Sequence, residues 1–235
     1  MALRAEVRHN TSVLYLATSC LQGRAIVSAT LDLLRLHPDG LQLCPGNHPA
    51  DGFGALLRRV TIPLRYHHGF SWRAYRAPVW SHAGDLLVDP QHRSVHPPRQ
   101  TPTIGFEKWL ERVAAQQIAV EIMPPGWILS DERSIDAALD ARVPLAVDVS
   151  HLHILREQGR LTDTGMRRIL NADTIVEVHV SDNDGRFDLH RPIGPCSFGT
   201  GWARERARDG LPVVLECYMH RLDEDERRAQ VERWR

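Results

Sequence analysis

The sequence predicts a single closed (β/α)8 barrel. Eight short runs of mostly Val, Ile, Leu and Ala, without polar alternation, alternate with helical segments from end to end. Strands of this composition are covered on both faces, and strand–helix alternation with eight strands favours a closed parallel barrel. The length of 235 residues suits one barrel, so residues 1–235 are expected to form one domain. The expected strands are 13–18, 41–44, 60–66, 93–96, 118–123, 145–149, 175–180 and 213–217.

Helical signals lie between these runs. Apolar residues at i, i+3, i+4 and i+7 spacing predict helices over 26–34 and over 106–113. Ser130 or Asp131 is a suitable N-cap for the helix that follows it. The charged segment 223–235 is expected to close the chain as a helix with a solvated face.

One stretch carries no helical signal. Residues 72–91 include Pro78 and Pro90, and we expect them to form a long loop over the barrel mouth. An open doubly wound sheet is the alternative fold. The glycine-rich signatures of nucleotide-binding sheets, GxGxxG and GxxxxGK[ST], are absent from the sequence, which speaks against that alternative.

Composition narrows the classes of function. Lys plus Arg and Asp plus Glu are 29 each, and this balance disfavours a nucleic-acid partner, because phosphate binding usually requires a basic excess. No long charge-free apolar run predicts a membrane span. The N-terminus lacks the apolar stretch of a signal peptide, so a cytoplasmic location is expected. None of the four cysteines forms a CxxC pair, and free thiols fit a reducing compartment.

Four charged or ligand-type residues fall near the C-terminal ends of successive apolar runs. They are Glu121, Asp148, His179 and Glu216. Barrel enzymes place their active sites at that end. A charge inside an apolar run is costly to bury unless it is paired or bound to a metal, and four at one end are hard to explain separately. A carboxylate-rich set with one imidazole suits a divalent metal, and a buried salt-bridge network is the alternative.

A second set of candidate residues surrounds these four. His151 lies three residues after Asp148, and Asp188 and His190 share one side of an extended loop through their i, i+2 spacing. We expect His151 and His190 to face the site. Three further histidines end the third and fourth runs, and the sequence leaves their role open: His67, His68 and His96.

These motifs, in this order, resemble the xylose-isomerase-like barrel superfamily. It includes sugar and sugar-phosphate isomerases and epimerases, inosose dehydratase and isomerase, and the endonuclease IV group. The resemblance extends over residues 118–217 and is vague before them. The motifs are Val120-Glu121-Ile122-Met123, Val147-Asp148-Val149-Ser150-His151, Val178-His179-Val180-Ser181-Asp182-Asn183, Asp188-Leu189-His190-Arg191-Pro192-Ile193-Gly194 and Val214-Leu215-Glu216.

In epimerase-like members, the resemblance implies one divalent ion on Glu121, Asp148, His179 and Glu216. Mn2+ is the expected ion, ahead of Zn2+, Co2+ or Fe2+. Glu121 and Glu216 would exchange protons with a substrate carbon, and a histidine at the position of His151 would bind substrate. We expect this single-ion arrangement, because the histidines of the first hundred residues align poorly.

In endonuclease-like members, the resemblance implies three zinc ions. A second ion would then lie on Asp188, His190 and His151. A third would lie on His96 with His67 or His68.

The sequence departs from the family pattern after His190. The family's Pro-x-Gly-x-Gly is replaced by Pro192-Ile193-Gly194-Pro195-Cys196, which brings a thiol close to the motif. The expected function is a metal-dependent isomerase or epimerase of a sugar or similar small polyhydroxy carbonyl compound, acting through an enediolate. The alternatives are a multi-metal phosphodiesterase, an iron-dependent oxidative enzyme of natural-product biosynthesis, and a non-catalytic binding barrel. The expected partner is a small molecule, and assembly into a homo-oligomer stays open.

Overall fold

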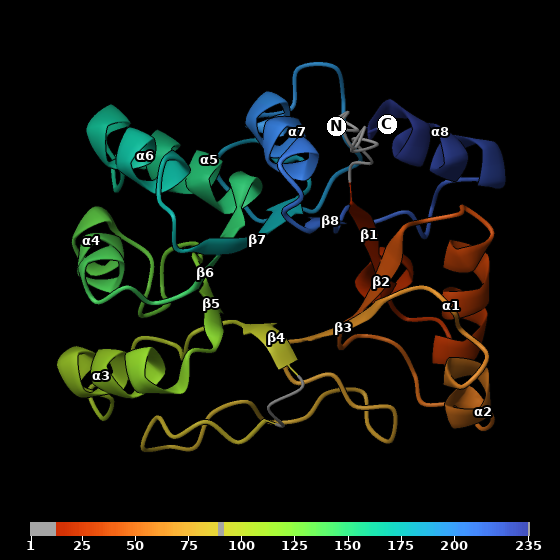
Figure 1. The fold of residues 1–235 in the computed structure, drawn as a ribbon, viewed down its shortest axis with the longest axis horizontal. Helices are drawn as coiled ribbons and strands as arrows, with labels where there is room; N and C mark the ends of the chain where they lie inside the picture. The colour runs from red at the N-terminus through yellow and green to blue at the C-terminus, as the bar shows by residue number, and fades with distance from the viewer. Residues whose placement is uncertain (1–12, 89–91, 235) are drawn as a thin grey trace, which may run out of the picture.

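The computed structural model describes residues 13–88 and 92–234, and it confirms the closed parallel barrel. Each strand pairs in parallel with its neighbour in sequence, and the last strand closes the ring against the first. Figure 1 shows the ring of strands with helices outside it. The strands are β1 (Leu14–Ala17), β2 (Gly40–Leu43), β3 (Leu64–His67), β4 (His92–Val95), β5 (Ala119–Glu121), β6 (Leu145–Asp148), β7 (Ile175–Val180) and β8 (Val213–Leu215).

The helices form the outer layer of the barrel. Helices are present where apolar spacing or an N-cap residue predicted them. The apolar stripe of the third α-helix buries Trp109 and Val113 against the barrel. Asp131 caps the fourth through a capping box with Ser134, as the sequence predicts. The helices are η1 (Thr18–Leu21), α1 (Ile26–Leu34), α2 (Phe53–Leu57), α3 (Phe106–Gln116), α4 (Glu132–Asp140), α5 (Val149–Glu157), α6 (Asp163–Leu170), α7 (Thr200–Arg208) and α8 (Glu224–Trp234).

The connection between β3 and β4 carries no helix in its described part. Residues 68–88 run as an irregular segment with one antiparallel bridge between Trp80 and Leu86 (Figure 1). The expected loop is therefore confirmed for residues 72–88, and residues 89–91 lie outside the described part. β3 begins at Leu64, later than expected, directly after Pro63, which has no backbone N–H for the strand ladder.

The barrel interior is apolar except for a few buried polar residues. Gln42, Ser94 and Glu177 lie on β2, β4 and β7 with no exposed surface. Among the helices of residues 13–88 and 92–234, none is long and apolar enough to cross a membrane. The expectation drawn from the N-terminal residues concerns residues outside the described part.

Candidate metal centre

The four predicted ligands all lie at the C-terminal mouth of the barrel, although no single group of neighbouring ligand-type atoms contains all four. Glu121 ends β5, Asp148 ends β6, His179 lies near the end of β7, and Glu216 directly follows β8. Asp148 and His179 face each other in the register of β6 and β7. All four side chains are buried. Parallel strands therefore bring to one place residues that are 95 positions apart along the chain, from 121 to 216.

Glu121 is surrounded by imidazoles. Its Oε2 lies 3.4 Å from His67 Nε2, 3.3 Å from His96 Nε2 and 3.3 Å from His179 Nδ1. Its Oε1 lies 3.2 Å from His151 Nδ1. Burial alone would raise the pKa of Glu121, but the positive charges of His179 and His96 hold it well below its usual range. One fully buried carboxylate thus faces four histidines, three of them on β3, α5 and β7 and the fourth directly after β4.

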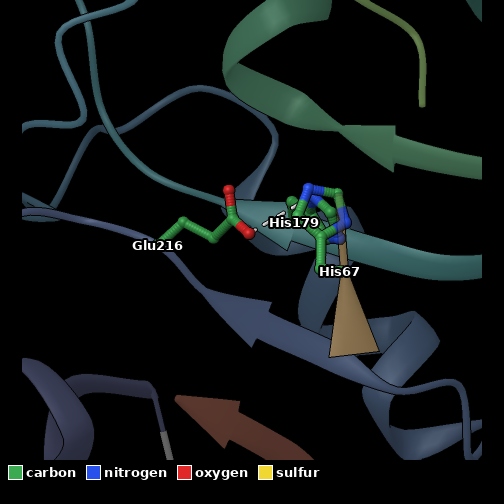
Figure 2. A group of neighbouring side chains, drawn as sticks. All are labelled: His67, His179 and Glu216. Atoms are coloured by element: carbon green, nitrogen blue, oxygen red, sulfur yellow. Dashed lines mark ion pairs between the residues drawn. The ribbon is translucent and has the colours of Figure 1, made fainter. Parts of the chain in front are cut away.

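The ligand-type atoms fall into three overlapping groups that could each hold an ion. Figure 2 shows His67, His179 and Glu216 pointing toward one another, with His179 Nδ1 3.6 Å from Glu216 Oε1. His67 also belongs to a group with His96 and Glu121, in which the two Nε2 atoms lie 3.1 Å apart. The third group is Glu121, Asp148 and His151. His67 has one free ring nitrogen and could serve only one of its two groups, whereas the two oxygens of Glu121 could serve both of the groups to which it belongs.

The loop after β7 brings Asp188 and His190 to the same place. Backbone hydrogen bonds between Asp182 and Arg191, of 3.0 and 2.8 Å, close the loop at its base. Asp188 Oδ2 then lies 3.2 Å from His151 Nε2 and 3.3 Å from His190 Nε2. Asp188, His151 and His190 are therefore neighbours, although they do not form one of the three groups above.

Buried polar atoms that lack a hydrogen-bond partner indicate whether these residues could bind a metal. A buried donor or acceptor without a partner costs about 1–3 kcal/mol, so proteins rarely leave several together. At this centre seven buried atoms of the described residues lack a hydrogen-bond partner, all on candidate ligands. Divalent cations would satisfy them, and the oxygen and imidazole donors fit Zn2+, Mn2+ or Fe2+. The atoms are Glu121 Oε1 and Oε2, Asp148 Oδ2, His151 Nε2, His179 Nδ1, His190 Nδ1 and Glu216 Oε1.

Three of the imidazoles are already oriented as ligands. A metal-binding histidine normally gives its other ring N–H to a protein acceptor, which fixes the tautomer. His67 Nδ1 lies 2.8 Å from Ser94 Oγ, and His151 Nδ1 lies 2.8 Å from the Ile122 carbonyl oxygen. His179 engages its Nε2 with a carboxylate. In each ring the remaining nitrogen faces the centre.

Glu177 contacts the candidate ligands and is absent from the residues predicted from the sequence. It lies two residues before His179 on β7, so both side chains point into the barrel. His179 Nε2 donates to Glu177 Oε1 at 2.7 Å. Gln42 Nε2 donates to the same oxygen at 2.9 Å, and Arg65 makes a 2.6 Å ion pair with Oε2. The i, i+2 spacing was a signal for Glu177, but only barrel closure brings its partners together.

Ser94 extends this network to a second ligand. Its hydroxyl donates to Glu177 Oε1 and lies next to His67 Nδ1. Glu177 therefore orients His179 directly and His67 through Ser94. These two histidines belong to the group drawn in Figure 2, so one buried carboxylate supports both imidazoles.

The structure places His68 and Cys196 apart from the three groups of ligand-type residues. His68 stacks on His96 at 3.6 Å between ring centroids, and its Nδ1 accepts the His96 backbone N–H at 3.2 Å. His68 belongs to none of the three groups of ligand-type residues. Cys196 is exposed and does not line the cavity at the centre, whereas buried Cys44 does. Burial raises the pKa of Cys44 well above its usual value, so it stays a neutral thiol.

Several ligands hold protons in the metal-free protein. Burial raises the pKa of Glu216 to about 7. Burial alone would lower the pKa of His190, but Asp188 raises it to about 9. In His151 and His179, facing carboxylates also outweigh burial and raise both pKa values well above normal. Metal ligation requires these groups deprotonated, so bound protons compete with metal ions.

Metal uptake is therefore expected to release protons. The raised pKa values favour protonated ligands at neutral pH, so metal affinity should increase as pH rises from about 6 towards 8. The expected slope is about tenfold per pH unit for each proton displaced. Calorimetric titration of chelator-treated protein with Zn2+, in buffers of different ionisation enthalpy, measures this release. Uptake without proton release would show that the ligands are already deprotonated.

Comparisons with known proteins identify the fold. No protein-family model matches the sequence, and no curated protein matches it. The solved structure of the TTHB071 protein from Thermus thermophilus, soaked with ZnCl2, is 17% identical with a TM-score of 0.53, covering 94% of this chain and 97% of that chain. A xylose isomerase domain containing protein from Salmonella typhimurium is 12% identical with a TM-score of 0.57, covering 94% of this chain and 95% of that chain. The chain has the xylose-isomerase-like barrel fold with buried His and Glu groups that could bind metal.

Proposed function

We propose that this protein is a multi-metal hydrolase of phosphate esters. The observation that carries the proposal is the position of Glu121, whose carboxylate belongs to two of the three candidate ion groups. A carboxylate shared between groups is suited to bridge neighbouring ions. Clustered divalent ions are typical of phosphoryl-transfer and hydrolytic sites, where they clamp the attacking and leaving oxygens.

The chain's own residues would hold and orient the ester. A cavity of about 120 Å3 lies at the centre, lined by Glu121, Glu216, His151 and Tyr218 among others. When bound, the ions would supply Lewis-acid activation of the phosphoryl group and of water. Water would form the new P–O bond, the ester P–O bond would break, and the alcohol would leave with a proton. Tyr218, one of the neutral donors that line this cavity, would hydrogen-bond the leaving oxygen.

The isomerase or epimerase function is the second candidate. One observation favours it: Glu121 and Glu216 line the same cavity. Proton exchange between a substrate and two glutamates requires such an arrangement. Against it, each oxygen of Glu121 already faces an imidazole nitrogen at 3.2–3.4 Å. As a ligand in two of the candidate ion groups, Glu121 would not be free to exchange a proton with a substrate carbon.

Phosphate-ester hydrolysis should depend on metal. Protein reconstituted with Zn2+ or Mn2+ is expected to hydrolyse 4-nitrophenyl phosphate or bis(4-nitrophenyl) phosphate at least about a thousandfold faster than chelator-treated protein. Asp148→Asn should abolish this rate. Asp173→Asn makes the same chemical change on the surface and should retain it. Protein that binds several ions but shows no turnover of either ester would exclude the hydrolase assignment.

Duplex DNA serves as the contrasting substrate in the same assay. Net charge is zero, and DNA binding gains most of its affinity from phosphate neutralisation by cationic side chains. We expect neither tight binding nor nicking of an abasic duplex at physiological salt. Efficient metal-dependent nicking would identify DNA as the substrate instead of a small ester.

A further inference from the structure

A larger groove opens directly from the metal centre. Its volume is about 660 Å3, and it shares His68, Arg76, His96, Asp188 and His190 with the inner cavity. The groove lies between the β3–β4 connection and the segments that follow β4 and β5. Pockets of this size bury molecules larger than a bare phosphate group. Anything bound at the centre can therefore extend outward without leaving the protein.

Part of the groove wall offers no free hydrogen-bond donor. Five prolines line it, and proline has no backbone N–H. Trp80 also lines it, but its indole N–H already donates to the His96 carbonyl at 2.7 Å. This part of the wall suits an apolar group. The prolines are Pro78, Pro97, Pro98, Pro124 and Pro125.

Hydrogen bonds and a cation–π contact hold the walls of the groove in place. Backbone hydrogen bonds join the segments after β4 and β5, from Gln100 N to Gly126 O at 3.0 Å and from Ile128 N to Pro98 O at 3.1 Å. The Arg99 guanidinium lies 3.9 Å from the centroid of the Trp127 ring. A preformed wall reduces the entropy lost on binding.

The charges facing the groove are mainly positive. Arg76 lines both cavities, is exposed, and makes no ion pair within the described part of the chain. Arg99 lines the outer groove. Asp188 is the only carboxylate among the described lining residues, and it faces His151 and His190. A ligand with a negative group near Arg76 complements this distribution.

We propose that the groove binds the organic part of the substrate. This part is an apolar group, aromatic in the simplest case, that is attached to the anion. This inference rests on the proposed function, because the phosphate group would lie at the metal centre beside Arg76. It deepens that function by naming the substrate class as amphiphilic phosphate esters.

Binding of non-hydrolysable probes tests the inference. Zinc-loaded protein is titrated calorimetrically with inorganic phosphate, methylphosphonate and phenylphosphonate. We expect phenylphosphonate to bind about tenfold more tightly than methylphosphonate, through burial of its ring. Ala77 lines the outer groove but not the inner cavity, so Ala77→Phe should remove this preference and leave phosphate binding unchanged.

The role of Arg76 has its own variant and control. Arg76→Met should weaken all three probes by about tenfold. Arg73→Met is the matched control, since Arg73 lies over Trp72 and lines neither cavity. Equal affinity for methyl- and phenylphosphonate would overturn the groove inference while leaving the hydrolase standing. Absence of any phosphate binding, with benzoate bound tightly and lost in Ala77→Phe, would overturn the phosphate assignment and keep the groove for a carboxylate.

Discussion

Glu121→Gln is expected to lose at least one metal equivalent and at least about a thousandfold in turnover. The amide keeps the shape of the side chain but presents one N–H2 group where two acceptor oxygens now face four imidazoles. Because the carboxylate belongs to two candidate ion groups, its loss should affect both. Metal analysis and ester hydrolysis, measured on the same preparation, check the prediction.

The folded state of this variant needs its own measurement. The apo Glu121→Gln protein should keep a cooperative thermal transition, at a lower temperature, because the amide no longer balances the charged histidines that hold the pKa of Glu121 low. Asp173→Asn, on an exposed ion pair, serves as the acid-to-amide control. A folded Glu121→Gln protein with normal metal content and rate would show that Glu121 is neither a ligand nor a catalytic group.

Glu177→Gln is expected to weaken metal binding or activity by roughly 10–100-fold, although Glu177 is not one of the proposed ligands. The amide keeps only one acceptor oxygen, so it cannot accept from Arg65 and also from His179 and Ser94, whose contacts fix the tautomers of His179 and His67. It also leaves the guanidinium of Arg65 unpaired, so some loss of thermal stability accompanies it. Zn2+ affinity and the visible absorption of Co2+-substituted protein report the change in ligand orientation.

A second variant separates orientation from general destabilisation. Ser94→Ala keeps the pair of Glu177 and Arg65 but removes the contact with His67. It should weaken the ion that uses His67 and leave the His179 contact intact. If Glu177→Gln lowered the melting temperature but left Zn2+ affinity and the Co2+ spectrum unchanged, Glu177 would be a structural residue only.

The sequence was most informative where a ligand-type residue interrupts an apolar run. Glu121, Asp148, His179 and Glu216 stood out because a charge or imidazole at a strand end has few structural reasons to be there. The eight runs also predicted the barrel, since strands covered on both faces lack polar alternation. His151 and His190 were expected to face the centre, and the structure brings both to it.

The other features of the site depend on contacts between residues far apart in the sequence, which no local pattern predicts. Glu177 meets Arg65 and Gln42 across 112 and 135 positions, and only closure of the ring makes them neighbours. The place of His67 depends on the irregular register between β3 and β4, at Tyr66 and His67. The outer groove is built from loops, whose course the periodicity of side chains does not determine.

The number of ions per chain tests the central claim most directly. Sequence reasoning favoured a single ion, whereas the shared position of Glu121 and the trio of Asp188, His151 and His190 favour several. Chelator-treated protein is saturated with Zn2+, freed of excess metal by gel filtration, and analysed by mass spectrometry against protein concentration. The account predicts about two or three equivalents per chain, with one fewer in His190→Ala. A single equivalent in wild type, unchanged in His190→Ala, would contradict it.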